Sequence, residues 1–213
     1  DLCDSLYQYT LLHIATEAKN HEIMRLCLQN GAQANAMAKR VTSAHLACQK
    51  DSLSMDSLRI LKEYGARFDV LDSARYLPLH YAIENGHEEM TRFFIEEKIN
   101  LNAQTKGLHR PLSIAVLGNH IKIFELLIQN AANPLLELDE KSCIVYLLIE
   151  EGLVDYFKVL VKHGFNLETP LMCGYSIADI AALKNQVKIL KYLKEQGVSL
   201  INAENPEKLT PLH

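Results

Sequence analysis

The stretch LPLHYAIENGHEEM, residues 77–90, combines side chains that could hold a metal ion. It contains two imidazoles and three carboxylates, His80, His87, Glu84, Glu88 and Glu89. Imidazole nitrogens and carboxylate oxygens are common zinc ligands. The same letters also fit the end of one helix, a turn at Gly86 and the start of a second helix. The stretch therefore predicts either a metal-dependent catalyst or a structural scaffold, and the rest of the chain decides between them.

Cysteine could supply a nucleophile or a further metal ligand, and the chain has five: Cys3, Cys27, Cys48, Cys143 and Cys173. Their odd number and the lack of any C-x-x-C spacing argue against a disulfide framework or a zinc site. Cys27 and Cys48 lie on apolar helix faces, whereas Cys173 precedes a glycine and is the thiol that we expect to be exposed. The chain also lacks a nucleophile elbow, a P-loop and an H-E-x-x-H motif. We therefore expect no catalytic residue, no metal and no cofactor.

Composition narrows the class of partner and the compartment. The 213 residues are 48% hydrophobic and 23% charged, which is ordinary for a folded protein. The net charge of −4 argues against nucleic acid as a partner, since nucleic acid normally meets a basic surface. No apolar run approaches the roughly 18 residues that cross a bilayer, and the opening DLCDSLYQY lacks a signal-peptide pattern. We expect a cytoplasmic protein without a membrane span.

A short apolar motif recurs along the chain every 32 to 35 residues. Its copies are LLHIA at 11–15, SAHLA at 43–47, PLHYA at 78–82, PLSIA at 111–115, IVYLL at 144–148, IADIA at 177–181 and PLH at 211–213. One position of the motif, which we call the histidine slot, holds His13, His45, His80, Ser113, Tyr146, Asp179 and His213. A fixed period of this length indicates stacked repeats that share a continuous core.

Each repeat has the same internal order. A short capping residue starts a first helix, as Thr10, Thr42, Ser176 and Thr210 do. A turn and a second helix with an apolar stripe follow. The second helix ends at a residue that we expect in the left-handed conformation, for example Gly31, Gly65, Gly164 and Gly197.

This order resembles that of the ankyrin repeat family, whose unit is a β-turn and two antiparallel helices with a T-P-L-H-x-A signature. The signature is matched best by Leu79-His80-Tyr81-Ala82 and by Thr210-Pro211-Leu212-His213. The resemblance implies an all-α solenoid of stacked helix-turn-helix units joined by β-hairpin-like loops, in a single domain over residues 1–213. Its repeats would cover 8–40, 41–75, 76–108, 109–141, 142–174 and 175–208, with a partial repeat at 209–213.

The repeat decides between the two interpretations of the opening stretch. Zinc–nitrogen bonds are about 2 Å long, so metal ligands must converge on one point. Equivalent residues of successive helices instead lie about 8–10 Å apart, so His13, His45 and His80 should form a ladder. We expect each to hydrogen-bond within its own turn, and His87 and His120, in the turns between helices, to be structural as well.

The fifth repeat departs from the family pattern at Cys143, Tyr146 and Leu148, where the family has Thr, His and Ala. Leu148 is bulky for a position where neighbouring helices approach closely, so the repeat could be locally splayed. In that case Leu148→Ala with Tyr146→His would stabilise the protein. A loss of stability would instead show that Leu148 fills a core of its own.

The resemblance implies a non-enzymatic module that binds a protein partner on the concave face of hairpins and first helices. Carrying over the family's variable positions gives Lys39, Val41, Gln49, Lys50, Tyr76, Glu84, Asn85, Lys106, His109, Asp139, Glu140, Glu150, Glu151, Met172, Tyr175, Leu183 and Lys184. Tyr76 and Tyr175 are aromatic residues of the type enriched at binding hot spots. The alternative is that each packs on a neighbouring hairpin.

Acidic residues gather around the fifth repeat, at Glu137, Asp139, Glu140, Glu150 and Glu151. On one side of the array they would form a patch that steers a partner with a basic surface. The alternative is an ordinary solvated face.

A second functional class stays open, namely the substrate-targeting region of a larger enzyme or effector with its catalytic domain elsewhere. The chain ends at Thr210-Pro211-Leu212-His213, within an expected first helix, so we expect the parent protein to continue. The mass of the native protein separates the two classes.

Overall fold

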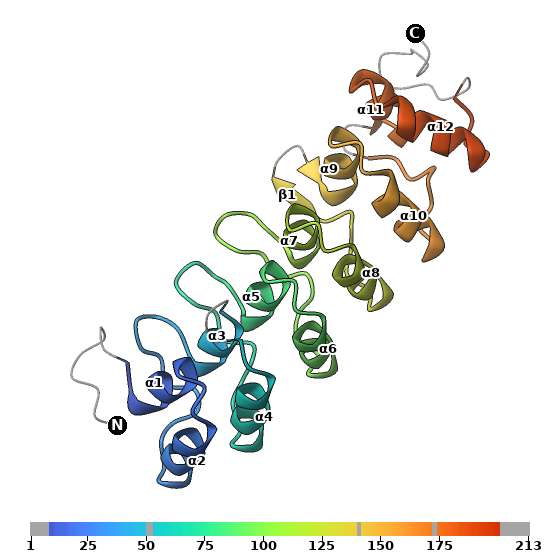
Figure 1. The fold of residues 1–213 in the computed structure, drawn as a ribbon. Helices are drawn as coiled ribbons and strands as arrows, with labels where there is room; N and C mark the ends of the chain where they lie inside the picture. Colours follow the sequence, from blue (N-terminus) through green and yellow to red (C-terminus); the bar gives the residue numbers. More distant parts are fainter. Residues whose placement is uncertain (1–8, 50–52, 140–141, 172–173, 201–213) are drawn as a thin grey trace. The chain divides into compact units, whose positions relative to one another are not determined.

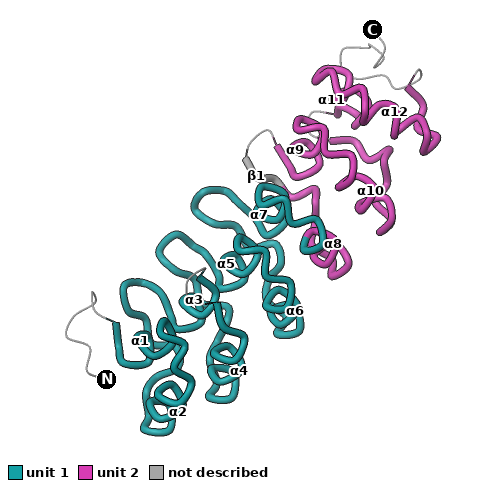
Figure 2. Tube along the Cα trace, viewed as in Figure 1, with its two compact units in different colours: residues 1–123 teal, residues 124–213 magenta. Residues whose placement is uncertain are grey.

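The computed structural model describes residues 9–49, 53–139, 142–171 and 174–200, and these residues form twelve helices and one short pair of strands (Figure 1). The chain is organised as two compact units, residues 1–123 (unit 1) and 124–213 (unit 2), shown in Figure 2. The boundary falls within helix α8 (Ile121–Gln129). Across the described ranges, no helix has the length and apolar composition needed to cross a bilayer.

Unit 1 is built from consecutive helix pairs. They are α1 (Leu11–Glu17) with α2 (His21–Gln29), α3 (Ser43–Cys48) with α4 (Met55–Glu63), α5 (Pro78–Glu84) with α6 (Glu88–Glu96), and α7 (Pro111–Leu117), which is followed by α8. The first helices form a row in which α1 contacts α3, α3 contacts α5 and α5 contacts α7. The predicted helix pairs are thus confirmed.

Unit 2 repeats this arrangement with α9 (Ile144–Glu150) and α10 (Val154–Lys162), then α11 (Ile177–Leu183) and α12 (Val187–Glu195). Helix α9 packs on α10 and α11, and α12 packs on α10 and α11. The loop before α9 contains strand β1 (Glu137–Asp139), which pairs antiparallel with β2 (Ser142–Cys143). An isolated bridge between Ala38 and Val41 marks the equivalent loop before α3. The connecting loops therefore have the hairpin character that the sequence predicted.

Of the predicted capping residues, Thr10, Thr42 and Ser176 begin their helices, and Thr210 lies outside the described residues. The hydroxyl of Thr10 accepts the His13 N–H, and that of Ser176 accepts the Asp179 N–H at 3.1 Å. Each bond satisfies a main-chain donor that has no partner within its helix. At the other end, the residue after the C-cap of the second helix is left-handed, with φ of 86° at Gly31 and 84° at Gly164. The expected glycine caps are confirmed.

The position two residues after the histidine slot holds alanine in every repeat except the fifth, and we call it the alanine position. It holds Ala15, Ala47, Ala82, Ala115, Leu148 and Ala181, none of them more than 3% exposed. Helices with small side chains at a contact can approach more closely. Leu148 is fully buried, with 0% of its surface exposed. The observation favours the interpretation in which Leu148 fills a core within unit 2.

The histidine slot completes the first turn of each first helix. The Thr42 N–H donates to Nδ1 of His45 at 3.2 Å, and the Leu77 N–H donates to Nδ1 of His80 at 2.8 Å. Ser113 and Asp179 act in the same way, because their side-chain oxygens accept the N–H of Arg110 and Ser176, respectively. The predicted hydrogen bond within each histidine's own turn is confirmed.

Each of the three histidines also reaches a main-chain carbonyl in the loop that follows its helix pair, which the sequence analysis did not predict. Nε2 lies 3.3 Å from the Val41 carbonyl in His13, 3.1 Å from the Tyr76 carbonyl in His45 and 3.2 Å from the Ala103 carbonyl in His80. In His45 and His80, Nδ1 accepts a main-chain N–H, so Nε2 carries the proton and donates to the carbonyl. Both rings are therefore neutral. The His45 ring connects two repeats, whereas the His80 ring joins its helix to the loop at the end of its own repeat.

Burial favours this neutral form. His13, His45 and His80 are all 0% exposed. Loss of water lowers the pKa of His13 and of His45, and it lowers the pKa of His80 to about 4, although the hydrogen bond to a carbonyl acts in the opposite direction. The ladder is a structural device that depends on uncharged imidazoles.

Candidate partner-binding face

The histidines that first suggested a metal site have structural roles instead. No group of three or more His, Cys, Asp or Glu side chains in the described part of the chain could hold a metal ion. His87 caps α6, since its Nδ1 accepts the Met90 N–H at 3.3 Å, and Nε2 of His120 lies 3.3 Å from the Glu84 carbonyl. These contacts agree with the structural roles expected for both histidines.

The described thiols are held in their protonated form. Burial raises the pKa of Cys27, Cys48 and Cys143. Because the thiolate is the reactive species, a raised pKa makes a cysteine a poor nucleophile at neutral pH. Cys173, which we expected to be exposed, lies outside the described residues.

The hairpin loop before α5 is organised by Asp72. Its carboxylate accepts the N–H groups of Ala74 and Tyr76 at 2.8 Å each, and the Tyr81 hydroxyl at 2.7 Å. The Lys106 N–H donates to the Ala74 carbonyl at 2.9 Å, which ties the next hairpin loop to this one. The loops are thus fixed to each other as well as to their helices.

Tyr76 lies in this loop and is half-buried. Its ring centroid is 5.5 Å from that of His80 and 5.2 Å from that of Tyr81. Part of the ring therefore packs on the first helix of its own repeat, which is neither of the two interpretations proposed, and the rest is exposed. Tyr175 is also half-buried, and its carbonyl accepts the Leu171 N–H at 2.9 Å to close the last hairpin loop.

The predicted binding residues near the first helices of unit 1 differ in how far they are exposed and in whether they bond to the scaffold. Glu84 is exposed, whereas Gln49 and Val41 are half-buried. The side-chain amide of Asn85 donates to the Cys48 carbonyl at 2.9 Å, so it joins two helix pairs. Asn85 thus contributes to the scaffold beside the face.

In unit 2, two of the predicted binding residues contact each other. The Lys184 ammonium forms an ion pair with Glu150 and lies 5.3 Å from the centroid of the Tyr146 ring. Glu151 is exposed, and Leu183 is exposed over 71% of its surface. The charge of Glu150 is therefore already compensated, while Glu151 and Leu183 face solvent.

The remaining predicted residues are placed as follows. Lys39 and Lys106 are exposed, and His109 is half-buried with its N–H donated to the Thr105 hydroxyl at 3.2 Å. Lys50, Glu140 and Met172 lie outside the described residues, and Asp139 belongs to β1 with no description of its side chain.

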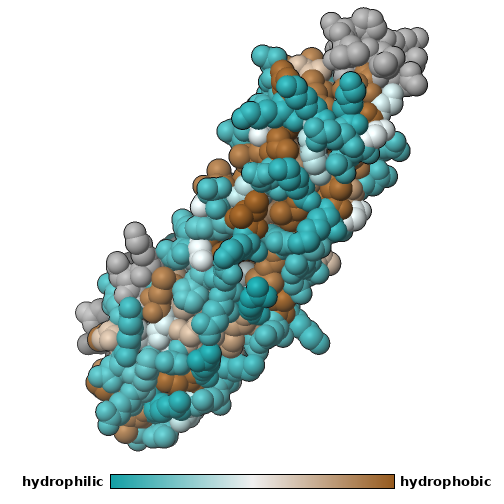
Figure 3. Space-filling view, turned by 45° about the vertical axis from the view of Figure 1, so that its right-hand side comes forward, coloured by the Kyte–Doolittle hydropathy of each residue, from teal (hydrophilic) through white to brown (hydrophobic). Residues whose placement is uncertain are grey.

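One exposed residue was missed by the sequence analysis. Leu117 ends α7 and is 63% exposed, at the position equivalent to Leu183 in α11. The signal was present, because both leucines follow the histidine slot by the same spacing. Figure 3 shows hydrophobic side chains of this kind between hydrophilic ones on the surface.

The outward sides of the second helices carry charges that pair with one another. In unit 1, Arg25 contacts Glu63 at 2.5 Å, Arg59 contacts Glu89 at 2.9 Å, and Lys62 pairs with Glu97. In unit 2, Lys162 contacts Glu125 at 2.6 Å. Exposed pairs contribute only about 0–1 kcal/mol each, and they compensate part of the charge on the helix backs.

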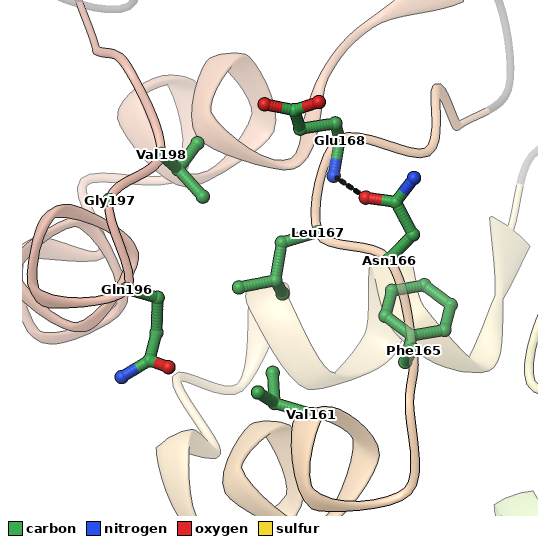
Figure 4. A pocket seen from close by; sticks show the side chains of 8 residues that line it. All are labelled: Val161, Phe165, Asn166, Leu167, Glu168, Gln196, Gly197 and Val198. Carbon is green, nitrogen blue, oxygen red and sulfur yellow. Dashed lines mark hydrogen bonds between the residues drawn. The ribbon is translucent and has the colours of Figure 1, made fainter.

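Unit 2 also contains a hollow of about 250 Å³ between the loops that follow α10 and α12 (Figure 4). Val161, Leu167 and Val198 supply apolar walls. The Asn166 side chain, one of its polar groups, accepts the Glu168 N–H at 2.9 Å and thereby stabilises its own loop. Glu168 and Gln196 are the other polar residues of its lining.

Comparison with known proteins identifies the repeat. A family model for three copies of the ankyrin repeat matches residues 55–137, and a model of a single ankyrin repeat matches residues 7–39. The ankyrin repeat domain of Bcl-3 superposes with a TM-score of 0.83 at 22% identity, covering 97% of this chain and 93% of that domain. The ankyrin repeat domain of human ASB11 gives a TM-score of 0.70 at 20% identity, covering 96% of this chain and 90% of that one.

Curated relatives are longer than this chain. A putative ankyrin repeat protein of fowlpox virus, FPV031, is 29% identical over 189 residues, which is 84% of this chain and 51% of its own length. The potassium channel AKT2/3 of Arabidopsis thaliana is 24% identical over 147 residues, 68% of this chain and 18% of its own length. The chain therefore spans about half or less of these relatives.

Proposed function

Because the chain belongs to the ankyrin repeat family, we propose that it is a non-enzymatic protein-interaction module whose partner binds the hairpin loops and first-helix ends. Ankyrin domains generally bind proteins. The observation that carries the choice of face is the contrast between the two sides of the helix pairs. Leu117 and Leu183 expose 63% and 71% of their surfaces at the first-helix ends, whereas the second helices carry charged pairs such as Arg25 with Glu63 beside a smaller exposure of Leu26 and Val187, 58% and 52%. Exposed apolar groups favour an interface, and ordered Lys and Glu oppose one.

A second candidate function is the substrate-targeting region of a larger enzyme or effector. It is favoured by the fraction of each relative that the chain spans, 18% for the plant potassium channel and 51% for the fowlpox protein. The mass of the native protein in its own cells distinguishes the two. A mass near 24.1 kDa would exclude the second candidate, and a much larger one would support it.

The face can be tested by replacing its two aromatic candidates. We expect Tyr76→Ala and Tyr175→Ala each to weaken partner binding by about 1–2 kcal/mol, the range common for interface anchors. The partner is first captured from cytosolic extract by a photoreactive amino acid placed at Leu183. The affinities of the purified variants for that partner are then measured by calorimetric titration.

Two helix-back variants serve as matched controls. Lys62 and Lys191 lie on the second helices α4 and α12, so charge reversal there should leave affinity unchanged. Circular dichroism confirms that each variant is folded, which is needed for Tyr76 because its ring packs on His80 and Tyr81. If the lysine variants lose affinity and the tyrosine variants keep it, the partner binds the helix backs.

We further propose that the partner has a basic surface, because acidic residues gather near α9. It is supported by exposed Glu151, while the pairing of Glu150 with Lys184 reduces the charge available there. Reversing Asp139, Glu140 and Glu150 to Lys should slow association several-fold at low salt, because opposite charges steer encounter. Stopped-flow association rates measure the effect, with Glu195→Lys in α12 as the control. Equal rates for the triple variant and the wild type would remove the basic-partner proposal.

A further inference from the structure

The hairpin loops of unit 1 expose four cations, Lys39, Arg40, Arg75 and Lys106. Among the ion pairs formed by the described residues, none involves these four side chains. Lys39 contacts the Tyr9 ring, at 4.4 Å from its centroid, which leaves its charge uncompensated. We call these four residues the basic loop stripe.

The acidic residues of the same loops do not neutralise the stripe. Asp72 is only 9% exposed, and its carboxylate accepts three hydrogen bonds, from Ala74, Tyr76 and Tyr81. Asp69 forms a two-point pair with Arg67, with both distances at 3.0 Å. The loops of a protein with a net charge of −4 therefore present local positive charge.

The backbone at two of these cations is one that glycine would suit better. The residue five before the histidine slot is left-handed in each described hairpin loop, with φ of 66° at Arg40, 61° at Arg75, 64° at Leu108 and 78° at Gly174. Glycine adopts this conformation freely, whereas other residues pay a steric cost. Unit 1 thus keeps two long cationic side chains at a strained position, and such strain is concentrated at functional sites.

Apolar groups flank the stripe and restrict the kind of ligand. Met37, Leu71 and Leu108 lie in the same loops and are 45%, 38% and 49% exposed. At the ends of the neighbouring first helices, Glu17 and Glu84 are exposed and would repel a uniformly anionic polymer. A protein segment that combines acidic and apolar side chains fits this surface better than nucleic acid does.

We propose that the basic loop stripe binds an extended acidic segment of the partner protein, with Arg40 and Arg75 as its main carboxylate contacts. The proposal rests on the proposed function and names the chemistry of the partner. A guanidinium can grip a carboxylate with two parallel hydrogen bonds, which a lysine cannot do. Three loops spaced by about 8–10 Å span roughly 20 Å, the length of about six extended residues. The bond from the Lys106 N–H to the Ala74 carbonyl fixes the spacing of two of them.

The test uses fluorescein-labelled peptides of about ten residues, long enough to span the three loops. One peptide alternates glutamate with leucine, and its counterpart has lysine in place of glutamate. Fluorescence anisotropy should show binding of the glutamate peptide only. Arg40→Gly and Arg75→Gly should each weaken it about fivefold, and the double variant at least about tenfold at low ionic strength. The effect should shrink as salt screens the charges.

Glycine is the informative replacement because it removes the charge and relieves the strained backbone together. Both variants should keep a Tm no lower than that of the wild type, so weaker binding cannot be ascribed to unfolding. Lys98→Gly is the matched control. It removes an exposed cation from a left-handed residue with φ of 56° directly after α6, where the loop begins, and should leave the affinity unchanged.

Two results would overturn the inference: equal affinity of the double variant and the wild type for the glutamate peptide, or binding of a single-stranded oligonucleotide with no binding of that peptide. Either could occur while the captured partner still crosslinks at the first-helix ends, in which case the proposed function survives. Crosslinking only at the helix backs would instead contradict the proposed function.

Discussion

As the pH falls from 7 toward 4, His80 alone should lower the free energy of unfolding by roughly 3 kcal/mol. Its pKa is about 4 in the folded protein, against the ordinary 6.5 that it regains on unfolding. Each unit of difference corresponds to about 1.36 kcal/mol. Because the folded pKa is the lower one, the unfolded chain takes up the proton first. Stability is therefore complete above pH 6.5 and is lost as the pH falls through the interval down to about 4.

The hydrogen bonds of His80 also indicate that stability falls on protonation. A proton on Nδ1 of His80 would displace the hydrogen bond from the Leu77 N–H and place a charge in a fully buried site. His13 and His45, whose pKa values are also lowered, should act in the same direction. Urea unfolding followed by circular dichroism at a series of pH values measures the change.

The chain itself suggests the control for this experiment. Ser113 fills the histidine slot of α7 and accepts the Arg110 N–H at 2.9 Å, so a serine can cap without titrating. His80→Ser should be less stable at neutral pH, because the bond to the Ala103 carbonyl is lost, and its stability should depend less on pH. A slope equal to that of the wild type would show that the acid sensitivity arises elsewhere.

Leu148→Ala should cost about 2–5 kcal/mol, the range for removing a buried leucine. The side chain is fully buried on α9, so truncation leaves a cavity as well as losing apolar contact. Urea unfolding measures the loss. The matched control is Leu183→Ala, which changes a leucine that is 71% exposed and should cost less than about 0.5 kcal/mol.

The opposite result for Leu148→Ala would also be informative. A gain in stability, above all together with Tyr146→His, would show that the bulky side chain holds the fifth repeat apart. The structure instead leads us to expect that Leu148 fills a core specific to this protein. In the other repeats an alanine at this position lets the neighbouring helices pack more closely.

Much of the fold could be predicted because its signals are local. The caps at Thr10 and Ser176 and the left-handed Gly31 and Gly164 depend on a few adjacent residues, and the period of the histidine slot shows that the local unit is repeated. The contacts between repeats were beyond this reasoning. His45 bonds to the Tyr76 carbonyl, a group that every residue has, so no residue type in the sequence marks this contact.

The candidate face was less predictable for a related reason. The variable positions of the family indicate which residues can lie on the binding face. Whether the side chain at such a position is free to contact a partner depends on its neighbours in space. The pairing of Glu150 with Lys184 and the use of Asn85 as a tie to Cys48 both join residues from successive repeats. Leu117 was missed although it follows the histidine slot by the same number of residues as Leu183.

The bond from His13 or His45 to the following repeat has an evolutionary consequence. Its acceptor is a main-chain carbonyl, that of Val41 or Tyr76, so the bond requires no particular side chain in the neighbour. A repeat that is duplicated, deleted or exchanged by recombination still presents that carbonyl to the imidazole before it. The joint between repeats can therefore be inherited unchanged while the surface residues of each repeat diverge.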